Sequence, residues 1–265
     1  MDRFPLRSLG SSAGRMVGMV LLFLAMQCLC MLMAVWTGGG ASFLELPASR
    51  SALWMLLSSL LTIIFFPLLS WVKPADFCFN SREWPIYIWS VAWMLSAILP
   101  ANLLSEALGL DNLLEEQMLA WMHTPWGVLN IVLAAPLAEE LIFRAGFIGT
   151  MRSRGCSARC AVVVSALLFG LIHGNPAQIP VAFLLGLMLG YVYVRGGSLW
   201  PCWFAHAANN LVGVLTAWLA GDSPSTLVDT LGGVWPSVLC TLLSLLLFIS
   251  IGMHIRRRHS VTFSD

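Results

Sequence analysis

The chain has 265 residues, of which 58% are apolar and 10% are charged, whereas about 25% of the residues are charged in a typical soluble domain. This composition excludes an ordinary soluble domain and predicts an all-α, polytopic membrane protein. The formal net charge of +1 gives no basis for an interaction with nucleic acid, and the seven cysteines lack the repeated CxxC spacing of a zinc ribbon.

Eight stretches are apolar and long enough to cross a membrane as helices. A bilayer core about 30 Å thick needs about 20 apolar residues per helix, and this length selects residues 16–36, 53–72, 85–104, 126–147, 159–173, 179–194, 199–220 and 234–254. The first stretch is expected to be a retained span, because it lacks a convincing small-residue cleavage site. The sequence GNP at 174–176 predicts a tight turn that joins the fifth and sixth spans into a helical hairpin. We expect a single transmembrane domain, residues 1–265.

The basic residues indicate how the chain is oriented, because loops rich in Lys and Arg face the cytoplasm. With eight spans and both termini cytoplasmic, thirteen of the fourteen Lys and Arg residues fall on the inner side, and only Arg50 falls outside. The acidic connections 106–116 and 222–229 fall on the outer side. Residues 112–121 are expected to form a short amphipathic helix on that outer surface.

Ionisable and amide side chains gather in three of the eight predicted spans. The fourth span carries Glu139, Glu140 and Arg144, the fifth carries His173, and the seventh carries His206, Asn209 and Asn210. A rise of 1.5 Å per residue places Glu139, the two histidines and Asn210 at depths of roughly 10–20 Å from the inferred cytoplasmic ends of their spans. Because these depths coincide, we expect the side chains to form one site.

A carboxylate, two imidazoles and a carboxamide at one depth have the chemistry of a hydrolase. Together they could hold a water, deprotonate it and stabilise the oxyanion that forms when it attacks an amide. Positions four apart share a helix face, so Glu140 and Arg144 are expected to form an ion pair that fixes the fold. Glu139 lies about 100° round the helix and stays free for catalysis. Asn209 faces away from Asn210 and is expected to bond to another helix.

Three motifs in this region resemble a known family. They are EExxxR at 139–144, FxxxH at 169–173 and HxxxN at 206–210. In this order they resemble the type II CAAX prenyl endopeptidases and their bacterial relatives, the CPBP (CAAX protease and bacteriocin-processing) intramembrane proteases, also called the Abi family. The resemblance covers about residues 125–220 and implies that these residues form a catalytic core. It also implies an intramembrane endopeptidase in the cytoplasmic membrane of a bacterium.

The resemblance implies a role for each residue of the motifs. Glu139 would activate water, His173 and His206 would orient that water or stabilise the oxyanion, and Asn210 would complete the oxyanion site. The supporting residues would be Glu140, Arg144 and Phe169. The chain departs from many members of the family at Ala145, since its glycine comes one residue later. We expect this departure to affect packing and not chemistry.

Members of this family are described both as metalloproteases and as glutamate proteases without metal. Glu139, His173 and His206 could hold a single zinc ion and leave one position open for water. No HExxH motif is present in the sequence to decide between the two mechanisms. The expectation is therefore either no cofactor or one divalent metal, with metal-free chemistry favoured.

Two other classes of function are compatible with charges inside a membrane. A proton-coupled transporter also carries Glu, His and Arg in its spans, and a non-catalytic member of the same fold would act in bacteriocin immunity or as a scaffold. The expected partners are the lipid bilayer and a membrane-associated or lipidated protein or peptide substrate. The GxxxG formed by Gly186 and Gly190 indicates close helix packing and leaves the oligomeric state open. The basic cluster at 256–258 is expected to anchor the topology and contact lipid.

Overall fold

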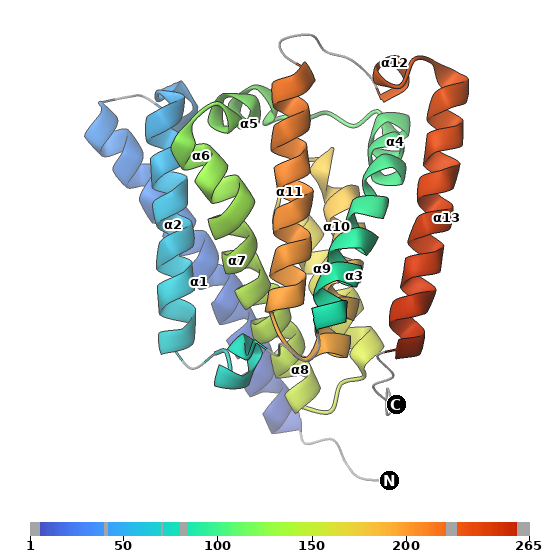
Figure 1. Cartoon of the computed structure of the whole chain (residues 1–265). Coiled ribbons are helices and arrows are strands. Elements are labelled where there is room, and N and C mark those ends of the chain that lie inside the picture. The colour runs from blue at the N-terminus through green and yellow to red at the C-terminus, as the bar shows by residue number, and fades with distance from the viewer. Residues whose placement is uncertain (1–5, 40–41, 70, 80–83, 221–226, 259–265) are drawn as a thin grey trace.

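The computed structural model describes residues 6–39, 42–69, 71–79, 84–220 and 227–258 (Figure 1). The described residues form helices and connecting turns without any strand, so the predicted all-α class is confirmed. The long helices are α1 (Leu6–Gly38), α2 (Ala48–Leu68), α3 (Trp84–Ser96), α4 (Ile98–Leu108), α9 (Ala158–Leu171), α10 (Gln178–Gly196), α11 (Trp200–Ala220) and α13 (Val234–Arg258). Three charged residues that entered the predicted orientation, Arg3, Arg82 and Asp222, lie outside the described residues.

Shorter helices connect these elements. They are η1 (Phe43–Glu45), η2 (Pro74–Phe77), α5 (Glu115–Met122) and α12 (Leu227–Thr230). A continuous helical run follows α5 and consists of α6 (Pro125–Leu129), η4 (Asn130–Ala134), α7 (Ala135–Glu140), η5 (Leu141–Ile148) and α8 (Gly149–Ser153). Glu139, Glu140 and Arg144 lie in this run, residues 125–153, which we call the catalytic helix after the role predicted for Glu139.

The described helices are those of an integral membrane protein. Five of them have the length and apolar composition of a membrane span, at Ala13–Gly38, Ala48–Leu68, Trp84–Leu108, Gln178–Gly196 and Val234–Arg257. The other three predicted spans correspond to the catalytic helix, the shorter α9 and α11. α1 begins and α13 ends at the same end of the bundle, the lower end in Figure 1, as an even number of spans requires. The count of eight and the orientation in the membrane stay predictions.

The catalytic helix is wider than an ordinary α-helix in two places. The segments η4 and η5 are π-helical, and the backbone N–H groups of Ala135 and Gly149 donate to the carbonyls five residues earlier, those of Asn130 and Arg144. Pro136 comes directly after Ala135 and has no N–H with which to continue this pattern to Ile131. Widened turns of this kind leave carbonyls that need other donors, and they are common at functional sites.

Side chains from neighbouring helices supply these donors. The carbonyl of Ile131 accepts from Asn210 Nδ2 at 2.8 Å, and the carbonyl of Phe143 accepts from Ser165 Oγ at 2.7 Å. The carbonyl of Leu133 accepts from Trp203 Nε1 at 3.0 Å. The widened helix is thereby fixed to α9 and α11, which carry the other two motifs.

The predicted hairpin of the fifth and sixth spans is formed by α9 and α10. Gly186 and Gly190 of α10 face α9, and a Cβ atom added at Gly186 would lie 3.0 Å from Ala166 Cα, while one at Gly190 would lie 2.9 Å from Val162 Cγ1. The GxxxG of α10 therefore serves packing within the chain. Gly174, in the turn between the two helices, has a φ of +61°, which favours glycine.

The predicted outer helix at 112–121 begins later than expected, at Glu115. Asn175 in the α9–α10 turn is fully buried and explains the difference. Its Oδ1 accepts from the backbone N–H of Leu113 at 3.1 Å, and its Nδ2 donates to Asn112 Oδ1 at 2.7 Å. The first residues of the predicted helix are therefore held in a loop by the hairpin.

Candidate active site

The two carboxylates of the EExxxR motif have different surroundings. Glu140 is fully buried and its Oε2 lies 3.1 Å from Nε of Arg144, which is 1% exposed, so the predicted ion pair is present. Glu139 is 19% exposed and points to α11, where its Oε2 lies 3.7 Å from His206 Nε2. One turn of helix thus presents one neutralised carboxylate to the core and one accessible carboxylate to the site.

His206 lies between these two carboxylates. Its Nδ1 donates to Glu140 Oε1 at 2.9 Å, a contact that the sequence did not predict. A carboxylate oxygen can only accept, so the proton of this bond belongs to Nδ1, and a neutral His206 carries its lone pair at Nε2. That lone pair and Glu139 Oε2 are both acceptors, and 3.7 Å is too long for a direct hydrogen bond.

Arg144 is held from three sides. Besides its contact with Glu140, its Nη2 donates to the carbonyl of Gly186 at 3.3 Å, and its guanidinium lies 4.5 Å from the centroid of the Phe169 ring. This cation–π contact and the carbonyl reduce the cost of burying the charge. Arg144 Nη1 is buried and has no hydrogen-bond partner among the described residues. The arginine therefore connects the catalytic helix to both helices of the α9–α10 hairpin.

Phe169 is the common neighbour of the three motifs. Its ring meets those of His173 and His206 edge to face, with centroid distances of 5.0 Å and 5.8 Å. His173 lies just past the end of α9, and its Nδ1 donates to the Phe169 carbonyl at 2.7 Å, which leaves Nε2 as the second ring nitrogen to meet a ligand. The structure therefore brings both histidines around one aromatic ring beside the Glu140–Arg144 pair.

Asn210 contacts the backbone of the catalytic helix, because its Nδ2 donates to the Ile131 carbonyl. Its Oδ1 accepts from Asn209 Nδ2 at 3.2 Å. The hydrogen bond recorded for Asn209 therefore runs within α11, and the prediction that Asn209 bonds to another helix is wrong. Asn210 has a second N–H on Nδ2 besides the one that Ile131 accepts, and its part in an oxyanion site stays a prediction.

A metal site would require several of these donors to converge on one point. Within the described ranges, no group of three or more His, Cys, Asp and Glu side chains is placed to hold a metal ion. As placed, Glu139, His173 and His206 do not fit a three-ligand zinc site. The hydrogen bonds of the two Nδ1 atoms leave Nε2 open on each histidine and are equally typical of metal ligands, so the misfit rests on the placement of the three side chains alone. We therefore derive no step of the reaction through a metal.

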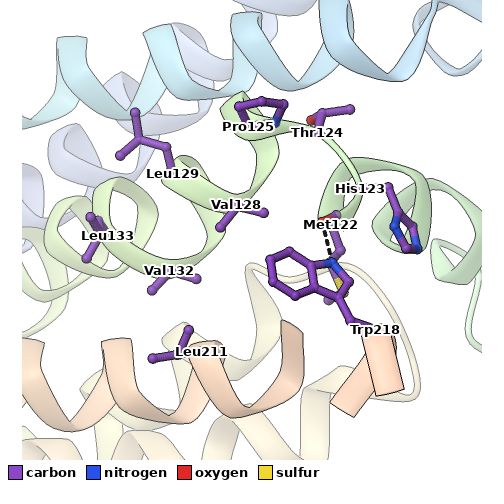
Figure 2. A pocket seen from close by; sticks show the side chains of 10 residues that line it. All are labelled: Met122, His123, Thr124, Pro125, Val128, Leu129, Val132, Leu133, Leu211 and Trp218. Atoms are coloured by element: carbon purple, nitrogen blue, oxygen red, sulfur yellow. Dashed lines mark hydrogen bonds between the residues drawn. The ribbon is translucent and has the colours of Figure 1, made fainter. Parts of the chain in front are cut away.

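An apolar pocket of about 490 Å³ lies beside the catalytic helix, between it and α11 (Figure 2). It is lined by Met122, His123, Thr124, Pro125, Val128, Leu129, Val132, Leu133, Leu211 and Trp218. Trp218 Nε1 donates to the Met122 carbonyl at 2.9 Å and closes one end. Leu133 and Leu211 are six and five residues from Glu139 and His206 on the same two elements. The pocket therefore offers an apolar surface close to the site.

Known proteins resemble this chain, and one of the matches falls on the region of the three motifs. Residues 121–212, which include all three motifs, match the family model described as "Type II CAAX prenyl endopeptidase Rce1-like". A protein of Bacillus subtilis (strain 168) named "Putative membrane peptidase YdiL" is 19% identical over 201 residues, which cover 72% of this chain and 82% of that protein. No solved structure matches. The resemblance inferred from the motifs is confirmed.

Proposed function

From the match of residues 121–212 to the type II CAAX prenyl endopeptidase family model and from the similarity to a membrane peptidase, we propose that the chain is a membrane protease in which Glu139 activates a water molecule for direct attack on a peptide bond. The observation that carries the proposal is the pair of acceptors formed by Glu139 Oε2 and His206 Nε2, 3.7 Å apart. Two acceptors that face each other need a donor between them. A water molecule has two O–H groups and can therefore donate one to Glu139 Oε2 and the other to His206 Nε2. Such a water has its oxygen lone pairs free for attack on a carbonyl carbon.

The reaction has two proton transfers and no covalent enzyme intermediate. Glu139 takes a proton from the water as its oxygen bonds to the carbonyl carbon, which gives a tetrahedral oxyanion. Glu139 then gives this proton to the amide nitrogen as the C–N bond breaks, so that the products are a carboxylic acid and an amine. The second N–H of Asn210 is suited to the oxyanion. His173 offers its Nε2 as an acceptor that orients the water or a substrate N–H.

Glu140 and Arg144 act through His206 in this scheme. Glu140 keeps the proton of His206 on Nδ1 and fixes the direction of the ring, as the buried carboxylate does in other catalytic triads. Arg144 supplies the counter-charge for the fully buried Glu140, at 3.1 Å. Both are positioning residues, and Glu139 is the catalytic base. The substrate class is a membrane-associated or lipidated protein or peptide, in agreement with the apolar pocket beside the site.

The proposal is tested with Glu139→Gln, which keeps the size of the side chain and removes the base. Glu115→Gln, on the exposed face of α5, is the matched control. Membranes from cells with each variant are compared by enrichment of protein N-termini and mass spectrometry. New termini should form with the wild type and the control, and should fall by a factor of about 10²–10⁴ with Glu139→Gln. Wild-type cleavage by Glu139→Gln would refute the proposal.

The same strains distinguish the other functions. Uptake of a solute that depends on a proton gradient and on Glu139, with no new terminus in any strain, would indicate a transporter. A phenotype that every variant restores would indicate a scaffold or immunity protein without catalysis.

A further inference from the structure

A second cavity of about 530 Å³ lies away from the catalytic residues, between α9, α10 and α13. It lies at the end of the bundle where α13 ends, which is the predicted cytoplasmic side (Figure 1). Three arginines line it, one from each helix: Arg159, Arg195 and Arg256. The other lining residues are Ala158, Val162, Val163, Leu187 and Tyr191, so none of its lining residues is acidic.

The three arginines make one end of the cavity basic. An anion that enters this end is attracted by the guanidinium groups around it. Arg195 lies 5.1 Å from the centroid of the Tyr191 ring, a contact that limits where its guanidinium can point. Ala158 is the first residue of α9, so the positive end of a 14-residue helix dipole faces the same cavity. Arginine is also the side chain that best matches the oxygens of a phosphate group.

The rest of the cavity is apolar and reaches the outer surface of the helix bundle. Val162, Val163 and Leu187 continue from the arginines along α9 and α10, and Val163 is 49% exposed. A free phosphate is too polar to contact these apolar side chains favourably, whereas the acyl chain of a lipid would pack against them. We propose that this cavity binds an anionic phospholipid, with the phosphate between Arg159, Arg195 and Arg256 and one acyl chain along the apolar wall.

The bound lipid connects α13 to the hairpin. α13 packs on α3 through the stacked rings of Trp93 and Phe248, 5.3 Å apart, and through His254 against Trp89, 4.5 Å apart. Arg256 extends from this pair of helices to the cavity that α9 and α10 line. A phosphate held by all three helices therefore stabilises the folded bundle, whatever the reaction at the active site.

The purified full-length protein tests this inference by native mass spectrometry and by thermal unfolding in detergent with added lipid. Phosphatidylglycerol should remain bound and raise the unfolding temperature, whereas phosphatidylcholine and inorganic phosphate should do neither. About 1 kcal/mol per arginine near an anionic surface corresponds to about fivefold in affinity. Each single Arg→Gln change at 159, 195 or 256 should therefore weaken phosphatidylglycerol binding about fivefold.

Arg257→Gln is the matched control, because Arg257 is exposed, does not line the cavity, and carries the same charge one residue away. It should bind phosphatidylglycerol as the wild type does. Equal weakening by Arg256→Gln and Arg257→Gln would overturn the proposal, since it would mean a general attraction to basic residues. Equal binding of phosphatidylcholine, or of inorganic phosphate alone, would also overturn it. The single variants keep two of the three arginines and are chosen because they disturb folding least.

Discussion

Exchanging either glutamate of the EExxxR motif for glutamine should separate stability from chemistry. Glutamine at 140 keeps the shape of the side chain and removes the charge that neutralises Arg144 at 3.1 Å. Arg144, 1% exposed, then remains as a buried cation without a counter-ion. Losing one partner of a buried ion pair costs about 3–5 kcal/mol of the free energy of unfolding. Glu139 is partly exposed and has no such partner, so Glu139→Gln should change stability by no more than about 0.5 kcal/mol.

A double-mutant cycle measures this difference. The four proteins are the wild type, Glu140→Gln, Arg144→Met and the double variant, and their unfolding is followed in detergent micelles against temperature and denaturant. The double variant leaves no buried charge of the pair and should be more stable than the sum of the single losses predicts, by about 1–3 kcal/mol. Its protease activity should still be low, because His206 has lost the carboxylate that orients its ring.

Two results would refute this reasoning. Glu140→Gln with the unfolding profile of the wild type would mean that Arg144 does not depend on Glu140. Additive losses in the cycle would mean that the 3.1 Å contact has no energetic consequence.

Three further changes test the structure around the site. Asn210→Leu should lower the free energy of unfolding by about 1–3 kcal/mol, because the buried carbonyl of Ile131 loses its donor. Asn209→Leu is the control and should lower the free energy of unfolding less. Equal losses for the two variants in thermal unfolding would contradict this prediction. Gly186→Val should lower the free energy of unfolding by about 1–3 kcal/mol and reduce cleavage, because a Cβ atom at this position would lie 3.0 Å from Ala166 Cα. Gly213→Ala on α11 is the control and should be tolerated, because a Cβ atom added there has no neighbour within 4 Å. Proteolysis should survive treatment with EDTA, and loss of activity that zinc restores would contradict the metal-free mechanism.

The sequence predicted the parts of the site that depend on spacing within one helix. Glu140 and Arg144 are four residues apart, so their ion pair follows from helix geometry alone, as does the separation of Glu139 from that pair. The hydrogen bond from His206 to Glu140 joins residues 66 positions apart. No spacing rule predicts which nitrogen of a histidine on one helix will meet which carboxylate on another, and only packing determines it.

The fold was predictable to a similar extent. Apolar length selects segments that are helical in the structure, because the bilayer imposes both conditions. The apolar length of a segment does not show that the catalytic helix widens at 130–134 and 141–148, because a π-turn depends on donors from other helices that bond to its free carbonyls. Pro136 was a visible sign of a missing N–H, but the partner that compensates, Asn210, lies on another helix. The contact of Asn210 with Ile131 was missed for this reason.

The α9–α10 hairpin gives the lipid cavity a physical route to the active site. Gly186 presents its carbonyl to Arg144, and Gly190, one turn later, allows α10 to approach Val162 of α9. Val162 is also part of the wall of the lipid cavity. A lipid that holds Arg159 and Arg195 together therefore stabilises the same helix contact that positions Gly186. If the hairpin separates at the end that carries Arg159 and Arg195, Arg144 loses the Gly186 carbonyl as an acceptor, and Glu140 loses a well-placed counter-ion. The anionic lipid should therefore increase the fraction of molecules in which His206 is oriented for catalysis.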